Sequence, residues 1–203
     1  MTVNYRDEMN KVINNGFNVK DSLKDKTVEE IREYQPKFGF SVCAMNLFGD
    51  LNVANIIRSS VIFGADKVYL AGRTNYDRRG SVGAQNYVDV VKLNYMKSEM
   101  DIDWNIVIND IMIDGYFPVL VEVGGKNVST FFDSLEYSTI REKYRKGPCF
   151  IFGNEGIGLP EDFIEFAGTF NLPIVSIQQH GVMRSLNVSV AAGIVMYEYM
   201  RGV

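Results

Sequence analysis

Apolar and polar positions along this chain alternate between short, nearly continuous apolar runs and longer segments in which apolar residues recur at helical spacing. Segments 51–64, 101–115 and 185–201 have the helical spacing, and the first two end at a glycine. Short apolar strands that alternate with helices predict an α/β fold, a parallel sheet with helices on both faces. The runs that predict strands are FSVCAMNL (40–47), KVYLAG (67–72), YVDVVKLN (87–94), FPVLVEVGG (117–125), PCFIF (148–152) and NLPIVSI (171–177).

The first 37 residues have a different character from the rest of the chain. They are polar, carry mixed charges and end close to Pro36. This composition predicts an N-terminal arm over residues 1–37 that is helical or partly mobile. The remaining residues, 38–203, are predicted to form one domain.

Composition narrows the class of protein. The 203 residues are 46% hydrophobic and 23% charged, which is ordinary for one globular domain with a real core. No window approaches 18 consecutive apolar residues and the N-terminus lacks the apolar region of a signal peptide, so we expect a cytoplasmic protein with no membrane partner. Cys43 and Cys149 lie in predicted strands, and we expect buried thiols rather than a disulfide framework or metal site.

The charge balance limits where a nucleic acid could bind. The net charge is −4 and the sequence pI is near 5.1, so the protein as a whole does not attract polyanions. A nucleic-acid site must therefore be a local patch. The candidate is GRTNYDRRG (72–80), in which Arg73, Arg78 and Arg79 accompany Tyr76. A solvated charged loop is the alternative interpretation.

A glycine-rich segment follows one of the predicted strands. In GNEGIGLP (153–160), three glycines allow the backbone to approach a ligand closely, and Glu155 adds a carboxylate. The alternative is a tight strand-to-helix turn in which Pro160 and Glu161 start the helix. Neither a phosphate-binding GxxxxGK[ST] loop nor GxGxxG is present, which argues against a dinucleotide-dependent oxidoreductase.

The segment DLNVANIIRSSVIFG (50–64) contains a second pair of candidate residues. Asn52 is a suitable N-cap for the predicted helix. Arg58 follows six residues later among apolar neighbours, where a buried arginine needs an anionic partner. We expect the two side chains to share a face of the helix and to point to the same end of the sheet.

The third candidate segment is QHGVMRSLNVSVAAG (179–193). One interpretation of this segment is that Ser185 caps the last helix, with Asn187 in its first turn. The helix is apolar all round, which predicts that it is buried or packed against another subunit. His180 fits no catalytic serine–histidine spacing, and we interpret it as a loop residue.

NVANIIR, GNEGIGL and SLNVSVAAG, in this order, closely resemble the three motifs of the SpoU (TrmH-like) branch of the SPOUT RNA methyltransferases. The resemblance covers about residues 40–201. It implies a C-terminal trefoil knot, S-adenosylmethionine (AdoMet) bound in that knot, and a homodimer. It also implies methyl transfer from AdoMet to a ribose 2′-hydroxyl of structured RNA. Only about 40 residues precede the region of resemblance, which leaves no room for the separate N-terminal RNA-binding domain of many larger relatives. Small relatives without that domain act on tRNA, so the resemblance favours tRNA over rRNA.

The resemblance further implies roles for individual residues. Arg58 would bind and polarise the 2′-hydroxyl and the adjacent phosphate, in the site of the other subunit; the identity of the base stays open. Gln178 and Glu122 depart from the proline and threonine common in the family. A non-catalytic RNA-binding or assembly protein with the same fold is the alternative. The implied substrate-side residues are Asn52, Arg58, Glu155, Ser185 and Asn187, and the implied cofactor-binding residues are Glu122, Gly124, Gly153, Ile177 and Leu186.

Overall fold

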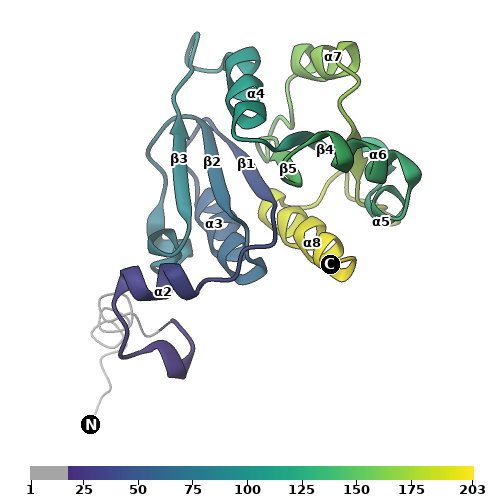
Figure 1. The fold of residues 1–203 in the computed structure, drawn as a ribbon. Helices are drawn as coiled ribbons and strands as arrows, with labels where there is room; N and C mark the ends of the chain where they lie inside the picture. Colours follow the sequence, from purple (N-terminus) through teal and green to yellow (C-terminus); the bar gives the residue numbers. More distant parts are fainter. Residues whose placement is uncertain (1–17) are drawn as a thin grey trace.

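The computed structural model describes residues 18–203, and its centre is a six-stranded sheet (Figure 1). The strand order is β3-β2-β1-β5-β4-β6, and every neighbouring pair is parallel. The predicted parallel sheet is therefore confirmed. The strands are β1 (Ser41–Asn46), β2 (Lys67–Gly72), β3 (Asp89–Leu93), β4 (Phe117–Asn127), β5 (Pro148–Phe152) and β6 (Ile174–Ser176).

Helices cover both faces of the sheet, also as predicted (Figure 1). Successive side chains of a strand point to opposite faces. In β1, Val42 and Ala44 pack in the cluster that contains α3 and α8, whereas Cys43 and Met45 pack in the cluster that contains α4 and α7. The α-helices are α2 (Val28–Tyr34), α3 (Leu51–Phe63), α4 (Trp104–Ile113), α5 (Val128–Phe132), α6 (Leu135–Lys143), α7 (Glu161–Thr169) and α8 (Val188–Arg201), and the short 3₁₀ helices are η1 (Asp21–Leu23), η2 (Arg78–Ser81) and η3 (Ala84–Asn86).

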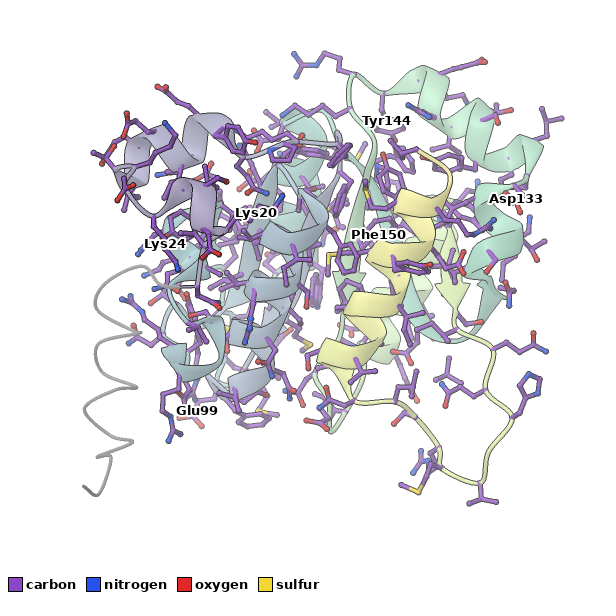
Figure 2. The ribbon with its side chains drawn as sticks, turned by 90° about the horizontal axis from the view of Figure 1, so that it is seen from below. Lys20, Lys24, Glu99, Asp133, Tyr144 and Phe150 are labelled. Carbon is purple, nitrogen blue, oxygen red and sulfur yellow. The ribbon has the colours of Figure 1, made fainter. Side chains whose placement is uncertain are left out.

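The last helix, α8, packs on the sheet beside α3. The ring centroid of Tyr199 lies 5.0 Å from that of Phe40 and 5.7 Å from that of Phe150. Figure 2 shows α8 in front of Phe150 and next to α3. Ser60 of α3, which is fully buried, contacts the sulfur of Met196 at 3.8 Å. The two helices thus form one layer over the centre of the sheet.

Part of the predicted N-terminal arm has regular structure. Thr27 and Glu30 form a reciprocal capping box at the start of α2. Ile31 is buried, and the Gln35 amide donates to the carbonyl of Val61 in α3 at 2.6 Å. Residues 1–17, the rest of the predicted arm, lie outside the described residues. The division of the chain at residue 37 stays a prediction.

Both cysteines are free and buried in neighbouring strands. Burial raises the pKa of Cys149 to about 12, so this thiol stays protonated near neutral pH. Among residues 18–203, no group of three or more His, Cys, Asp or Glu side chains could hold a metal ion. No helix in the described part of the chain has the length and apolar character needed to cross a membrane.

A polar cluster stabilises the edge of the sheet where the strands begin. The Lys67 ammonium lies 2.7 Å from the carboxylate of Asp114, and the Tyr69 hydroxyl donates to the same oxygen at 2.5 Å. Burial raises the pKa of Asp114, but the hydrogen bonds from Lys67 and Tyr69 outweigh it, so the net pKa is lowered. The charged form of Asp114 is therefore the stabilising form.

We expect Asp114→Asn to lower the free energy of unfolding by about 1 kcal/mol at pH 7. A carboxyl group whose folded-state pKa is depressed stabilises the protein above its unfolded pKa of about 3.9, and this contribution disappears as pH falls through the folded value. Urea unfolding at pH 7 and below pH 3 measures the difference, with exposed Asp25→Asn as the control. A loss of stability that is the same at both pH values would contradict this account.

Candidate functional site

A cavity of about 480 Å³ lies between the irregular part of β4, around Glu122, and the loops that follow β5 and β6. These three strands are neighbours in the sheet, so their carboxyl ends meet at one edge. Ligands of open α/β sheets bind outside this edge, and the cavity volume is within the range of small-molecule sites, about 300–1000 Å³. The cavity is therefore the candidate binding site of the described structure.

The glycine loop after β5 needs glycine at its first position. A Cβ atom at Gly153 would lie 2.3 Å from the carbonyl carbon of Gly158, because two backbone hydrogen bonds join Asn154 to Gly158 across the loop. Gly158 itself has a φ of +68°. The loop also leads into α7, which begins at Glu161 after Pro160. The strand-to-helix turn, one of the two alternatives for this segment, is therefore present, and close approach of the backbone to a ligand stays a prediction.

A bulge in β4 carries Glu122 to the same cavity. The register of β4 against β6 shifts between Val121 and Lys126, both of which lie opposite Val175. The Glu122 carboxylate accepts a hydrogen bond from the backbone N–H of Leu159 at 2.9 Å. It thereby ties the bulge to the end of the glycine loop. Gly124, with a φ of +88°, lies in the bulge and does not line the cavity.

Three side chains that are far apart in the sequence meet at the rim of the cavity. The Asn52 amide donates to one oxygen of the Glu155 carboxylate at 2.6 Å, and the Asn187 amide donates to the other at 2.9 Å. The Asn187 amide also donates to the Asn52 carbonyl oxygen at 2.9 Å. We call these residues the Asn–Glu–Asn cluster. It fixes both oxygens of an exposed carboxylate in one orientation.

Both helix caps suggested by the sequence in this region are wrong. Asp50, not Asn52, caps α3 by accepting from the backbone N–H of Asn52 at 3.0 Å. Asn187, not Ser185, caps α8 by accepting from the N–H of Ser189 at 3.0 Å. Because Asp50 caps α3, the Asn52 side chain is available to bind Glu155.

The structure also corrects the predicted environment of Arg58. Arg58 is exposed rather than buried, and it lines a separate cavity of about 300 Å³ with Lys20 and Tyr34 of the N-terminal segment. Six residues along an α-helix amount to about 600°, which leaves Arg58 and Asn52 roughly 120° apart around α3. The predicted shared face is therefore wrong, and Arg58 does not join the Asn–Glu–Asn cluster within one chain.

The prediction that the last helix is buried all round is also wrong for the single chain. On α8, Val190 is 50% and Tyr197 is 60% exposed. On the adjacent α3, Ile62 is 68% exposed, and the rings of Phe63 and Tyr197 are in contact, 6.5 Å apart. The two helices thus share an exposed apolar face.

The segment between β6 and α8 forms the remaining wall of the cavity. Ile177, Ser185 and Leu186 line the cavity, and every residue from 178 to 186 is exposed. Figure 2 shows this segment extending away from the N-terminal end of α8. His180 is exposed in the loop, as predicted, and Gln178 is exposed beside it.

The three arginines of the 72–80 segment differ in their surroundings. The Arg79 guanidinium donates to both carboxylate oxygens of Asp77, and these hydrogen bonds lower the pKa of Asp77 to about 2. The Arg78 guanidinium lies 6.0 Å from the centre of the Tyr76 ring. Arg73 is exposed. The charge of Arg79 is thus locally balanced, whereas neither Arg73 nor Arg78 forms an ion pair with a carboxylate of residues 18–203.

Comparison with known proteins identifies the family. The model of the SpoU rRNA Methylase family matches residues 39–197 of this chain. The chain belongs to the SpoU family. No curated protein sequence matches this SpoU family member.

Solved structures of SpoU-type proteins share the fold. A TrmH/SpoU tRNA modifying enzyme from A. aeolicus is 21% identical, with a TM-score of 0.63, over 86% of this chain and 81% of that one. An AdoMet-bound rRNA methyltransferase from Sinorhizobium meliloti is 23% identical, with a TM-score of 0.59, over 85% and 60%. An RNA 2′-O ribose methyltransferase is 23% identical, with a TM-score of 0.61, over 88% and 61%. This SpoU chain spans about three fifths of the last two.

The cavity of this SpoU protein fits a cofactor of the size of AdoMet. Three of the six residues that the glycine loop contributes to its lining are glycines, at positions 153, 156 and 158, and the wall after β6 is partly apolar. Of the five residues that sequence reasoning connected with the cofactor, Glu122, Gly153, Ile177 and Leu186 line the cavity. Sequence reasoning did not find the contact of the Glu122 carboxylate with Leu159, because it depends on the bulge in β4.

Proposed function

We propose that this protein transfers a methyl group from AdoMet to a ribose 2′-hydroxyl of structured RNA, with tRNA the favoured substrate over rRNA. One observation carries the proposal. The Asn–Glu–Asn cluster holds the Glu155 carboxylate at the rim of the cavity, close to the exposed Ser185 segment. Family membership and the resemblance of all three motifs support the assignment.

The reaction makes few demands on acid–base groups of the chain. AdoMet supplies a methyl group bonded to a sulfonium sulfur. After methyl transfer the leaving group is a neutral thioether, so it needs no acid. The 2′-hydroxyl transfers its proton to a base, whose identity stays open, as the new bond forms, so the hydroxyl must also be polarised. Arg58 would bind this hydroxyl and the adjacent phosphate, since a guanidinium is a good donor and a poor base. The Asn–Glu–Asn cluster would orient the ribose against the cavity.

The active unit in this proposal is a homodimer. Arg58 lies outside the cavity of its own chain, and the apolar face of Ile62, Val190 and Tyr197 is exposed. Pairing two chains about a two-fold axis would bury this face and could place Arg58 at the partner's cavity. The trefoil knot and the cytoplasmic location belong to the same proposal.

We expect the arginines of the 72–80 segment to contribute unequally to RNA binding. Arg73→Ala or Arg78→Ala should each reduce the slope of log affinity against log salt concentration by about one, because one phosphate contact is lost. Arg79→Ala should have a smaller effect, since Asp77 already balances its charge. Filter binding over a salt series measures this, and calorimetry should show unchanged AdoMet affinity. Equal effects of all three substitutions would contradict the proposed difference.

Mass spectrometry of ribose-methylated nucleosides tests the proposed reaction directly. Purified protein and AdoMet are incubated with total tRNA or total rRNA from cells that lack the protein. A new 2′-O-methylnucleoside in tRNA that is absent with Glu155→Gln is the expected result. RNA binding without methylation of either pool would favour the non-catalytic alternative.

A further inference from the structure

Phe48 is an exposed aromatic side chain at the same edge of the sheet as the cavity. It lies two residues after the end of β1, and 58% of the residue is exposed. Neither the cavity nor the Asn–Glu–Asn cluster includes it. Ligands of open α/β sheets bind outside the carboxyl ends of the parallel strands, which is where Phe48 lies.

The loop that carries Phe48 is held rigidly against the loop after β2. Asn46 is 1% exposed, and its amide donates to the carbonyls of Arg73 at 2.5 Å and Asn75 at 3.0 Å. The Asn46 side-chain oxygen accepts from the backbone N–H of Gly49 at 2.9 Å. A buried amide with three hydrogen bonds fixes both loops, so Phe48 is presented by a preorganised support.

Cationic side chains lie on the second of these two loops. The backbone N–H of Asp77 donates to the carbonyl of Gly49 at 2.9 Å, so residues 73–78 run beside the Phe48 loop. This strip carries the exposed Arg73 and Arg78. An exposed ring next to cations is the combination by which proteins bind unpaired RNA: bases stack on the ring and phosphates contact the cations.

The same loop leads into the proposed active site. Asp50, two residues after Phe48, caps α3, and Asn52 belongs to the Asn–Glu–Asn cluster. A nucleotide bound at Phe48 would therefore lie next to one bound at the cluster. This continuity favours RNA over a protein partner as the molecule that covers Phe48.

We propose that Phe48 stacks on an unpaired base adjacent to the nucleotide that is methylated, while Arg73 and Arg78 contact the RNA backbone. The inference rests on the proposed function and narrows it: the substrate segment is an RNA loop or other unpaired stretch, not a continuous duplex. Phe48 acts as a specificity-determining residue.

Tryptophan fluorescence tests the stacking without depending on activity. Trp104 is the only tryptophan, and it is buried and stacks on Phe163. Trp104→Phe therefore removes the tryptophan fluorescence of the protein while keeping an aromatic ring in this stack. In that background, the fluorescence of Phe48→Trp should be quenched by total tRNA, saturating together with RNA binding. Phe170→Trp is the control: Phe170 is 62% exposed at the end of α7, near the edge where β6 begins. Its fluorescence should not change.

Kinetics of the otherwise wild-type protein provide the second measurement. Phe48→Leu should raise KM for RNA about tenfold with little change in kcat, because base stacking is lost while the reacting groups stay in place. Phe48→Tyr should restore most of the affinity. Phe170→Leu should leave both constants unchanged.

Two fluorescence results would overturn the inference. One is unchanged Phe48→Trp fluorescence at RNA saturation; the other is a spectral change that depends on protein concentration without RNA, which would place Phe48 in a subunit contact. Quenching by RNA with no methylated product would support stacking and contradict the proposed reaction. Methylation by Phe48→Leu with a wild-type KM would support the proposed reaction and contradict stacking by Phe48.

Discussion

Replacing Asn187 with aspartate is expected to lower kcat/KM for RNA methylation by about 100-fold, or about 2.7 kcal/mol of transition-state stabilisation. The new carboxylate retains the oxygen that caps α8. It loses the amide N–H groups that donate to Asn52 and Glu155, and it faces the Glu155 carboxylate at the position of a 2.9 Å hydrogen bond. Methyl transfer from labelled AdoMet measures the loss of activity, and thermal unfolding measures any loss of stability. The unfolding temperature should change little.

The pH dependence of this variant distinguishes charge repulsion from loss of structure. Two adjacent carboxylates raise each other's pKa, so lowering the pH toward 5 should protonate one of them and recover activity relative to wild type. Asn187→Ser is the matched control, because serine caps the helix without adding a charge. Its relative activity should not depend on pH. Wild-type activity in Asn187→Asp at pH 8 would exclude the cluster from the reaction.

Two inactive variants are expected to recover about a quarter of wild-type activity when they form mixed dimers. One is Arg58→Ala, and the other has a blocked cofactor cavity. Random pairing makes half of the dimers mixed, and in a shared-site dimer one of their two sites combines intact halves. The measurement is methyl transfer by co-expressed, differently tagged chains.

The blocking substitution must leave the glycine loop folded. Gly153 is unsuitable, because a Cβ there would lie 2.3 Å from the Gly158 backbone. At Gly156, which also lines the cavity, a Cβ meets only the Asn154 side-chain oxygen, at 3.4 Å. Gly156→Trp, shown by calorimetry to have lost AdoMet binding, is the suitable partner. Mixed dimers without activity would show that Arg58 serves the cavity of its own chain.

The sheet could be predicted from sequence because every strand except β3 contains a nearly continuous apolar run. Helices α5 and α6 were not predicted, since α5 has only five residues and most residues of α6 are exposed; the caps Asn127 and Ser134 were their only clear signals. That Arg58 and Asn52 point in different directions could have been predicted from helical geometry, because each residue turns the helix by about 100°.

Other features of the site depend on contacts that periodicity does not encode. Both helix starts offer two polar residues two positions apart, and the sequence does not tell which one turns to the backbone. Asp50 does so at α3 and Asn187 at α8. The contact between Glu122 and Leu159 requires the bulge in β4, which is a shift in the register of β4 against β6. Motif residues were thus easier to predict than their partners.

The strand order has a consequence for synthesis of the protein on the ribosome. Strands β1, β2 and β3 are consecutive in the chain and in the sheet, whereas the other edge of β1 pairs with β5, with Ser41 opposite Cys149. That edge of β1 therefore stays unpaired until more than one hundred further residues have emerged, and such open edges promote aggregation. The Asn–Glu–Asn cluster forms later still, after α8 has been made, so no nascent chain that ends before Asn187 contains the complete site.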